Sequence, residues 1–572
     1  MAPSRGNFLL VLHSHLPLVL GHGRWPHGSD WLCEVAIGCY LPLIEVFERL
    51  STRGRRSRVT LNITPILAEQ LAHPSFPPEM EAFLRQRLES AEENRVHFER
   101  NGLPDLAGLA QLWEQIYRNT LSRFHALGGD LLGAIRRLAE AGVIELITSA
   151  ATHGYLPLLG REESVDLQLR TGKAAHLRHF GAPPRGAWLP ECGYRARYEW
   201  TPPAGPLAGK VRWRRRGVEE FLAAHDLEFF VTDSHLLRGG VPLSFYGDHY
   251  PALRALAAGA EYPTYSRDRS PYRPYSVASR GGNGSAVAFT RDPRTTMQVW
   301  SREAGYPGDP MYLEFHKKHF PGGIRYWRVT DARGDLGSKL SYDPQAAHAA
   351  ARGHAEHFAR IVGELAETEA HKSAWPVAVC NPYDTELFGH WWFEGPAFLE
   401  EILERLPAAG VEPESLGGYL DRCPQPEVIT LPEGSWGEGG DHRVWLNRDT
   451  RWTWEMVYAA EEEFWSVAGD PAWEGNSFLR RVVAQLAREL LLLQSSDWQF
   501  LITTWAARNY AEARFAEHYA HFTRLGHLLH RVAEGQPVQK DDELFLAARE
   551  AQDFPFPDVL DHVRAAREVK SL

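Results

Sequence analysis

The chain has few cysteines, no long apolar run and no surplus of basic residues, and each absence excludes a class of protein. Its five cysteines, spread over 572 residues, form no CxxC pair. A disulfide scaffold is therefore excluded, and free thiols in a reducing compartment are expected. Lysine and arginine number 62 against 73 aspartate and glutamate, a net charge of −11, which excludes a general nucleic-acid-binding surface. Internal repeats and low-complexity tracts are also absent from the sequence.

The sequence also lacks signals for export and membrane insertion. Its first apolar run, residues 8–12, is interrupted by His13 and His15 before it reaches the length of a signal-peptide core. No stretch approaches the ~20 apolar residues that a membrane-spanning helix requires. We therefore expect a cytoplasmic protein with neither a nucleic-acid nor a membrane partner. The sequence carries no signal for an oligomeric state.

Aromatic residues and histidines are abundant. Tryptophan, tyrosine and phenylalanine make up 11% of the chain, including 19 tryptophans, and 26 histidines accompany them. Sugar rings have apolar faces that stack on tryptophan and tyrosine, and their hydroxyl groups bind polar side chains, so this composition favours a carbohydrate ligand. Most single aromatic residues nevertheless belong to the core. Only those that cluster with polar residues point to function.

Short apolar runs alternate with helical patterns along the first 380 residues. The seven predicted strands are residues 8–12, 59–63, 143–147, 187–189, 229–231, 286–289 and 376–380, and helical patterns cover 34–50, 131–141, 218–225 and 346–369. Continuous apolar strands of this kind are typical of parallel strands buried on both faces. They predict an α/β fold of the (β/α) barrel type, whose active site lies at the carboxyl ends of the strands.

Two segments depart from this alternation and define the predicted domains. Residues 77–118 have a helical pattern, and from about Trp452 onward the pattern is nearly all helical. We predict a catalytic barrel of residues 1–76 and 119–420, a helical insertion of residues 77–118 and a C-terminal helical domain of residues 421–572. The long connection of residues 239–285, rich in proline, glycine and tyrosine, predicts a lid.

Two carboxylates follow predicted strands. Glu191 lies in Trp-Leu-Pro-Glu-Cys-Gly-Tyr, and Asp384 lies in Asn-Pro-Tyr-Asp-Thr-Glu-Leu-Phe-Gly-His-Trp-Trp. Cleavage of a glycosidic bond with retention requires one ionised carboxylate as nucleophile and one protonated carboxyl group for the departing oxygen, about 5–5.5 Å apart. Glu191 and Asp384 are the right types of residue for this pair. A salt-bridged surface glutamate is the alternative interpretation of Glu191.

His13 and His15 are two residues apart on the first predicted strand, so both point to the same side. Such a pair is suited to binding a metal, to hydrogen bonding a substrate, or to a structural role. Zinc requires at least a third ligand, and no nearby motif supplies an obvious one.

Five motifs, taken together and in order, resemble those of family 57 of the glycoside hydrolases, and within it the α-1,4-glucan branching enzyme group. They are HSHLP (13–17), ELITSAATHGYLPLL (145–159), WLPECGY (188–194), VWSREAGYPGD (299–309) and NPYDTELFGHWWFEGP (381–396). The resemblance continues to SSDWQFLITT (495–504), so it covers nearly the whole chain. It implies an incomplete (β/α)7 barrel with a helical insertion, a C-terminal α-helical domain that completes the substrate cleft, and no metal or other cofactor.

The resemblance also implies roles for individual residues. It makes Glu191 the nucleophile and Asp384 the general acid/base. The residues it implies around the sugar chain are His13, His15 and His153 in the donor subsite, Trp188 and Trp392 as aromatic walls, Arg273, Trp436 and Asp497 as further glucan contacts, and Tyr246 at the tip of the lid. The outer residues have structural alternatives: a loop salt bridge for Arg273, a core ring for Trp436, a helix-end cap for Asp497 and an incidental loop residue for Tyr246.

The expected activity is that of a branching enzyme in glycogen-type synthesis. Such an enzyme cleaves an α-1,4-glucan donor and transfers the chain to the 6-hydroxyl of an acceptor chain. The alternatives are a 4-α-glucanotransferase or α-amylase with the same carboxylates, a metal-dependent deacetylase or mannosidase-like barrel that uses His13 and His15, and a non-catalytic glucan-binding protein. Thr290 and Ala506 stand where the group tends to have glycine and glutamine, which affects the expected chain-length preference more than the chemistry.

Overall fold

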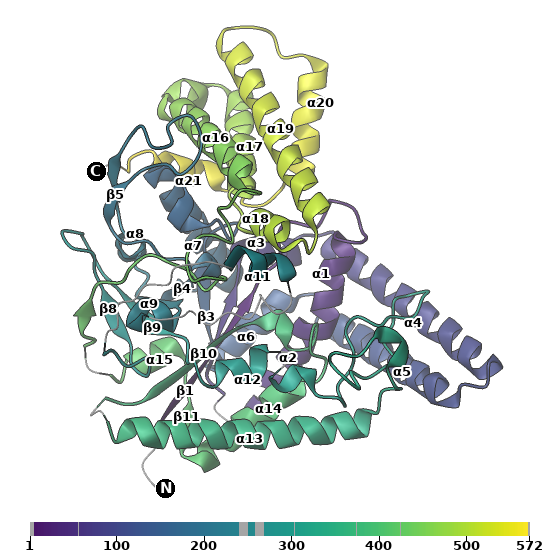
Figure 1. The fold of residues 1–572 in the computed structure, drawn as a ribbon. Helices are drawn as coiled ribbons and strands as arrows, with labels where there is room; N and C mark the ends of the chain where they lie inside the picture. The colour runs from purple at the N-terminus through teal and green to yellow at the C-terminus, as the bar shows by residue number, and fades with distance from the viewer. Residues whose placement is uncertain are drawn as a thin grey trace.

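The protein is built around one curled, mostly parallel sheet (Figure 1). The computed structural model describes residues 5–54, 57–239, 250–257, 268–301, 304–372, 375–423 and 425–569. The strand order is β10-β1-β2-β3-β4-β7-β9-β8-β12, and β11 pairs with β1. The strands are β1 (Gly6–Ser14), β2 (Val59–Ile63), β3 (Ile144–Ser149), β4 (Gly186–Trp188), β7 (Phe229–Thr232), β8 (Tyr275–Val277), β9 (Ala286–Thr290), β10 (Ala378–Asp384), β11 (Val411–Pro413) and β12 (Val428–Ile429).

All seven predicted strands are present, and each pairs in parallel with its neighbours from β10 through β1, β2, β3, β4 and β7 to β9. Strand β8 adds to β9 in antiparallel orientation. Within the described residues no ladder joins β9 to β10, so the sheet does not close. The predicted fold class, an incomplete (β/α)7 barrel with further helical parts, is confirmed.

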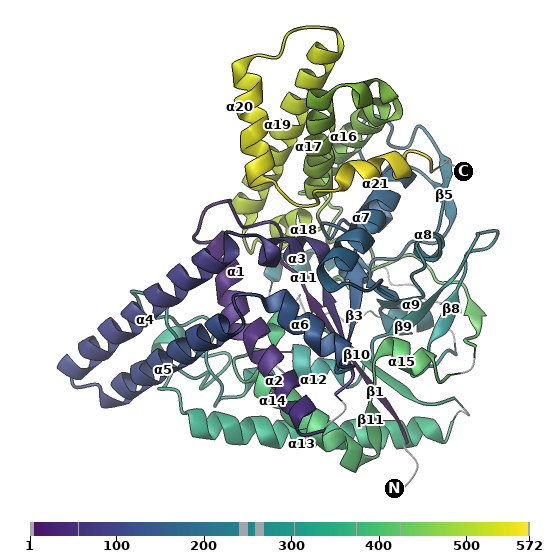
Figure 2. The same cartoon turned by 180° about the vertical axis from the view of Figure 1, so that it is seen from behind.

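Helices cover the outer face of the sheet (Figure 2). The cap residue Asp130 starts one of them, α6, by accepting a hydrogen bond of 2.7 Å from the backbone N–H of Gly133. Asp343 caps the longest, α13, and Pro344 occupies its first turn. The helices around the barrel are α1 (Ser29–Val35), α2 (Leu41–Thr52), α3 (Pro65–Ala72), α6 (Leu131–Glu140), α7 (Glu162–Phe180), α8 (Val218–Ala224), α9 (Ser234–Arg238), α11 (Pro251–Ala257), α12 (Thr296–Trp300), α13 (Pro344–Ala370), α14 (Gly395–Arg405) and α15 (Leu416–Leu420). A separate hairpin pairs β5 (Tyr198–Trp200) with β6 (Trp213–Arg215).

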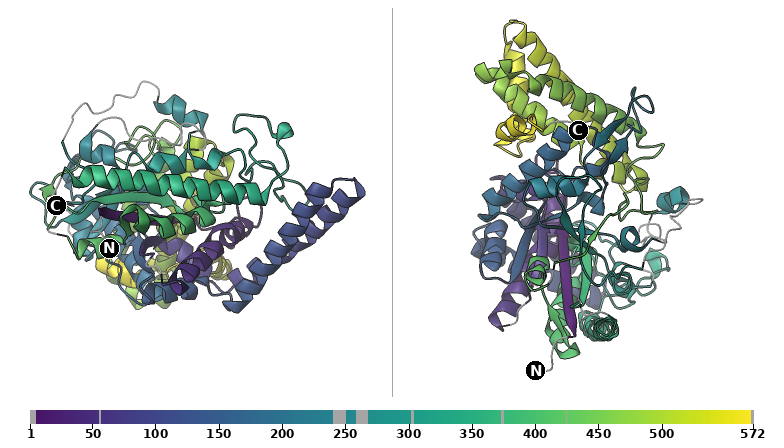
Figure 3. Two further views of the ribbon diagram at one scale, coloured as in Figure 1. Left: turned by 90° about the horizontal axis from the view of Figure 1, so that it is seen from below. Right: turned by 90° about the vertical axis from the view of Figure 1, so that its left-hand side faces the viewer.

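A helical hairpin projects from the side of the barrel (Figure 3). It consists of α4 (Phe76–Arg100) and α5 (Pro104–Ala126), and α5 continues beyond residue 118, where the sequence places the end of the insertion. The indole N–H of Trp113 donates a hydrogen bond of 2.6 Å to the backbone oxygen of Arg325. This bond ties the hairpin to the loop that precedes α13.

A second helical unit packs on the end of the barrel where the strands finish (Figures 1 and 3). Its helices are α16 (Arg451–Gly469), α17 (Ser477–Leu493), α18 (Asp497–Thr504), α19 (Arg508–Ala533), α20 (Lys540–Gln552) and α21 (Val559–Ala566). Thr152, in the loop after β3, donates to the backbone oxygen of Leu491, and Gln168 donates to the side chain of Gln494 at 3.0 Å. The predicted boundary after residue 420 falls within the barrel region, because β12 still pairs with β8. In the described part of the chain, no helix combines the length and the hydropathy that crossing a bilayer demands.

Candidate active site

The carboxyl ends of the parallel strands bring the predicted catalytic residues to one edge of the sheet. His13 lies at the end of β1 and is the register partner of Asp384, the last residue of β10. Glu191 follows β4 in a single 3-10 turn, Pro190–Cys192. Asp233 and Arg291 follow β7 and β9 at the same edge. This is the edge at which (β/α) barrels place their active sites.

The backbone at Glu191 is strained. Its φ of 59° and ψ of 25° lie in the left-handed region, and Cys192 follows with a φ of 50°. Residues with a Cβ avoid this region, and such strain costs about 1–3 kcal/mol per residue. The turn is held by a hydrogen bond of 3.1 Å from the backbone N–H of Trp436 to the backbone oxygen of Glu191, and by pairing of Tyr194 with Gly434. These backbone contacts therefore hold the strained turn, and with it the Glu191 side chain, in place.

The Glu191 carboxylate accepts two hydrogen bonds from segments far along the chain. The Trp436 indole N–H donates to Oε2 at 2.9 Å, and the Ser496 hydroxyl donates to Oε1 at 2.9 Å. The Nδ1 atom of His153 lies 3.9 Å from Oε1. Burial raises the pKa of Glu191 to about 7, although both hydrogen bonds lower it. The group therefore titrates near neutrality.

Three histidines and Trp188 form a stack beside Glu191. The rings of His13 and Trp188 are 4.4 Å apart at 6°, and those of His15 and His153 are 4.1 Å apart at 22°. Burial lowers the pKa of His13 and of His153 well below the usual value, so both are neutral at pH 7. Burial also opposes a charge on His15, but its hydrogen bond of 2.9 Å to Asp497 and the nearby carboxylates outweigh burial and raise the pKa of His15.

Tryptophan rings surround the carboxylate. The Trp436 ring contacts Trp188 at 5.2 Å and Trp300 at 5.9 Å between centroids, both edge to face. The guanidinium of Arg291 lies 5.9 Å from the centroid of Trp436 and pairs with Asp233. Burial opposes the charge on Asp233, but Arg291 lowers the pKa of Asp233 to about 2. The ion pair thus keeps a fixed carboxylate and a fixed cation beside the ring cluster.

Asp384, the last residue of β10, is half-buried, and Glu386, two residues further along the chain, is buried. Glu386 accepts hydrogen bonds from the Tyr40 hydroxyl at 2.6 Å and from the backbone N–H of His15 at 3.1 Å, and burial raises the pKa of Glu386 to about 7. Burial raises the pKa of the Cys192 thiol, and the charges of both Glu191 and Asp384 raise it further. Both carboxylates therefore lie close enough to Cys192 for their charges to act on it.

Sequence reasoning missed three residues that complete this arrangement. Ser496 and Trp300 lie inside motifs that the sequence shows, SSDW and VWSREAGYPGD, but neither stands out there as an individual residue. Glu386 has a weaker signal, its separation by two residues from Asp384. Glu386 matters to the site because it is buried beside His15 and Tyr40, and a local sequence motif does not show which residues are buried.

Two of the predicted site residues that the structure describes do not join the cluster. Trp392 is 2% exposed and packs against Tyr312 and Phe398 at 5.4 and 4.9 Å between centroids, which is a core position. Arg273 pairs with Glu427 at 3.0 Å and donates to the Tyr275 hydroxyl at 2.9 Å, at the sheet edge formed by β8. Tyr246 lies outside the described residues.

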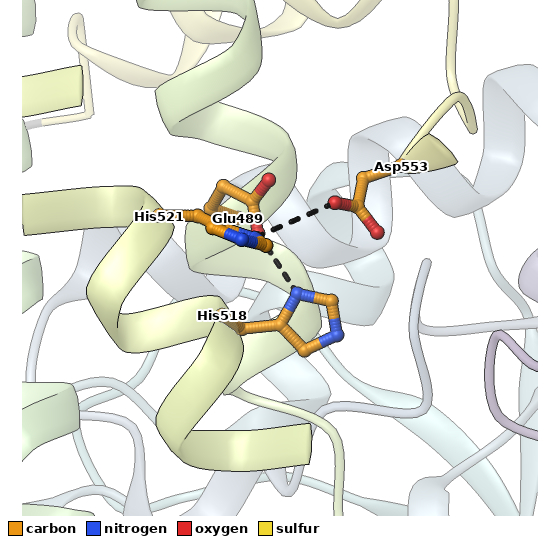
Figure 4. Close-up of side chains that lie close together, drawn as sticks. All are labelled: Glu489, His518, His521 and Asp553. Carbon is orange, nitrogen blue, oxygen red and sulfur yellow. Dashed lines mark hydrogen bonds and ion pairs between the residues drawn. The ribbon is translucent and has the colours of Figure 1, made fainter. Parts of the chain in front are cut away.

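Among the described residues, two groups of side chains have the composition of metal sites. His15, His153 and Asp497 are at the active edge, where His15 and Ser495 already bind Asp497. The second group, in the C-terminal helices, consists of Glu489, His518, His521 and Asp553, whose ligand atoms lie within 4.8 Å of one another (Figure 4).

Hydrogen bonds and nearby guanidinium groups connect the side chains of this second group. His518 Nδ1 donates to Glu489 at 2.8 Å and its Nε2 accepts from Arg514 at 2.9 Å, so both ring nitrogens are engaged. Arg549 Nη1 lies 3.8 Å from Asp553 Oδ2. Burial and the nearby Asp553 raise the pKa of Glu489 well above its usual value, and both nitrogens of His518 are engaged, so we interpret the group as a structural network.

An incomplete (β/α) barrel with two carboxylates, neutral histidines and indole rings at the ends of its strands defines the class of barrel enzymes that act on glycosidic bonds. Residues 9–432 match the model of glycosyl hydrolase family 57, and residues 456–563 match that of the C-terminal part of 1,4-α-glucan branching enzymes. The chain belongs to glycosyl hydrolase family 57.

Individual relatives support both matches. The chain is 40% identical, over 97% of its length and 78% of the relative, to the 1,4-α-glucan branching enzyme TK1436 of Thermococcus kodakarensis. The solved structure of a GH57-type branching enzyme from Pyrococcus horikoshii matches with a TM-score of 0.87 and 38% identity, covering 98% of this chain and 97% of that one. The α-amylase AmyC of Thermotoga maritima matches with a TM-score of 0.79 and 28% identity, covering 98% and 99%. The family and the branching-enzyme group predicted from sequence are confirmed.

Proposed function

We propose that the protein is a 1,4-α-glucan branching enzyme in which Glu191 is the nucleophile and Asp384 the general acid/base. The observation that carries this assignment is the Glu191 carboxylate, fixed by Trp436 and Ser496 at the same strand-end edge as Asp384. The match of residues 456–563 to branching enzymes and the identity to TK1436 support the choice of branching within the family.

In the first half-reaction Glu191 Oε attacks the anomeric carbon of an α-1,4-linked donor. The bond from that carbon to the glycosidic oxygen breaks, and Asp384 gives its proton to the departing oxygen. The product is a covalent glycosyl ester of Glu191 with an inverted anomeric centre. When His15 is protonated, its charge lowers the pKa of Glu191 and so favours the ionised nucleophile before attack.

In the second half-reaction Asp384 takes the proton of an acceptor 6-hydroxyl. The acceptor oxygen attacks the anomeric carbon, the ester bond to Glu191 breaks, and a second inversion gives overall retention with an α-1,6 branch. The neutral rings of His13 and His153 suit hydrogen bonds to donor-sugar hydroxyls, and His153 Nε2 has no partner within the described structure. Trp188, Trp436 and Trp300 provide apolar surface beside the sugar.

Transfer must compete with hydrolysis, so the acceptor chain has to be held while water is kept from the ester. We assign Tyr246, in the long connection after β7, to this function. The donor and acceptor are α-1,4-glucan chains, and the product belongs to glycogen-type polymer synthesis. We place the reaction in the cytoplasm, since all five cysteines are free thiols.

Linkage analysis tests the proposal. Amylose is incubated with the purified protein and with Glu191→Gln, and α-1,6 linkages are counted by proton NMR and by debranching. We expect new α-1,6 linkages with the unmodified protein and a loss of about 10⁴-fold or more with Glu191→Gln. New reducing ends without branches would establish an α-amylase, in keeping with the similarity to AmyC, and altered α-1,4 chain lengths without branches would establish a 4-α-glucanotransferase.

A further inference from the structure

A cavity of about 580 Å³ lies between the helical hairpin and the barrel wall. Helices α2 and α14 form its barrel side, α4 and α5 form its hairpin side, and residues 315–325 close one end (Figure 1). Its volume is within the ~300–1,000 Å³ of small-molecule sites. Lys318 and Asn119, which line it, are exposed, so the cavity opens to solvent. None of the active-edge residues lines it.

Aromatic rings form much of the wall. Trp113 packs against Tyr117 at 5.4 Å and against Phe393 at 5.3 Å between centroids. Phe315 is half-buried, and the cationic groups of Lys318 and Arg325 lie 5.6 and 5.7 Å from its centroid. Rings that line an open cavity offer the flat apolar surface on which the C–H faces of sugars pack.

Polar groups with unused hydrogen-bonding capacity converge on the same cavity; Arg325 Nη1 donates only to the backbone oxygen of His390, at 3.2 Å. In the described part of the chain, neither Lys318 nor Arg325 makes an ion pair, and the Tyr117 hydroxyl makes no hydrogen bond. The His390 ring also has no hydrogen-bond partner among described residues, and burial lowers the pKa of His390 to about 3, so the ring is neutral. A neutral imidazole and a phenol each donate and accept, whereas the two cations donate.

The charge of the lining decides between a neutral and an anionic ligand. Five glutamates line the cavity against four lysines and arginines. Anionic ligands gain nothing from such a lining, while a purely apolar ligand would leave the Tyr117 hydroxyl and the His390 ring without hydrogen-bond partners. A ligand rich in hydroxyl groups satisfies donors and acceptors together and also packs on the rings.

We propose that this cavity is an accessory binding site for an α-glucan chain, separate from the catalytic edge. The choice of glucan rests on the proposed function, because that function supplies the substrate class. A chain segment held here keeps the rest of the polymer near the active edge and raises its effective concentration there. The site therefore affects long glucans and not short ones.

Titration calorimetry on the full chain carrying Glu191→Gln tests the proposal without turnover. With maltoheptaose as probe, we expect two molecules bound per chain. Phe315→Ala and Lys318→Ala should each weaken the second site by about tenfold and leave the first unchanged. The matched controls are Phe320→Ala and Lys317→Ala on the same segment; Phe320 is 68% exposed, Lys317 lies over Trp327, and neither lines the cavity. Thermal unfolding of all four variants confirms that they fold.

A single bound maltoheptaose, or equal effects of the lining and control variants, would overturn the proposal. Displacement of maltoheptaose by inorganic phosphate at the second site would also overturn it, because it would identify an anion site. In the catalytically active background, Phe315→Ala should raise KM for amylose and leave kcat unchanged. If the protein forms branches but binds only one maltoheptaose, the cavity proposal fails and the proposed function stands. If it binds two molecules but forms no branches, the proposed function fails and the cavity proposal stands.

Discussion

Glu191, the proposed nucleophile, has a pKa that depends on several local contacts. Burial raises the pKa of Glu191 to about 7, and the hydrogen bonds from Trp436 and Ser496 limit that rise. Because attack requires the ionised form, activity falls as the pH drops below about 7. Glu191 was predictable from its position after an apolar strand, whereas its donors come from segments 245 and 305 residues away, a separation no local pattern reveals.

Replacement of Ser496 by alanine should move the acidic limb of the pH profile upward. Without the hydroxyl, the carboxylate loses a charge-assisted hydrogen bond of about 1.5–3 kcal/mol, which corresponds to a rise in the pKa of Glu191 of about one unit or more. The limb of kcat/KM against pH reports this shift in the free enzyme. Ser338→Ala, on an exposed turn, serves as control. An acidic limb that stays in place would show that Ser496 does not tune the nucleophile.

Glu191→Gln should stabilise the protein at alkaline pH. A carboxyl group whose folded pKa is raised from 4.5 to about 7 lowers the free energy of unfolding as the pH rises through that interval. Removal of the buried charge would alone stabilise the fold by about 3 kcal/mol at pH 8. Glutamine accepts one hydrogen bond fewer than the carboxylate, and this loss leaves a net gain of about 1 kcal/mol. Denaturant unfolding at pH 8 and pH 4.5 measures it. Equal or lower stability of the variant at pH 8 would contradict the assigned environment.

At the scale of elements, sequence predicted the parallel strands well because each is an unbroken apolar run buried on both faces. It did not predict β8 and β12, which contain three and two residues and depend on pairing with each other at the sheet edge. The motif around Trp392 led to its prediction as a wall of the site. The structure instead packs Phe398 of α14 against the Trp392 ring, which is a core position.

Close packing of α7 on β3 depends on Gly172. A Cβ at this position would lie 2.2 Å from the backbone oxygen of Ser149, so Gly172→Ala must displace the helix and should cost about 1–3 kcal/mol or more. Gly353 in α13 is the matched control, since a Cβ there meets nothing within 4 Å. Gly353→Ala should gain about 0.5–1 kcal/mol through helix propensity. Denaturant unfolding compares the two, and a stabilising Gly172→Ala would contradict the packing described.

At the scale of the whole molecule, the C-terminal helices contribute side chains to the candidate active site. Ser496 and Asp497, at the start of α18, bind Glu191 and His15 of the barrel. Further contacts join the two units, including a hydrogen bond of 2.8 Å from the backbone N–H of Gly160 to Glu461. The two units should therefore unfold together.

Leu491→Ala should lower the temperature of a single, shared unfolding transition. Leu491 is fully buried in α17, and its truncation should cost about 2–5 kcal/mol. Calorimetry and residual branching activity, measured on the same samples, should report one coincident midpoint. Leu544→Ala in α20 is the control, because Leu544 is 58% exposed. Two resolved transitions, with activity retained through the first, would contradict the coupling.

The dependence of Glu191 on Ser496 has a consequence for biosynthesis. The ribosome completes every strand of the barrel before it adds the residue that donates to the nucleophile. An unfinished polypeptide therefore carries both acidic groups yet lacks the hydroxyl and the aspartate that set the charge of the catalytic centre. Chains released before residue 496 should therefore lack the hydrogen bond that lowers the pKa of Glu191.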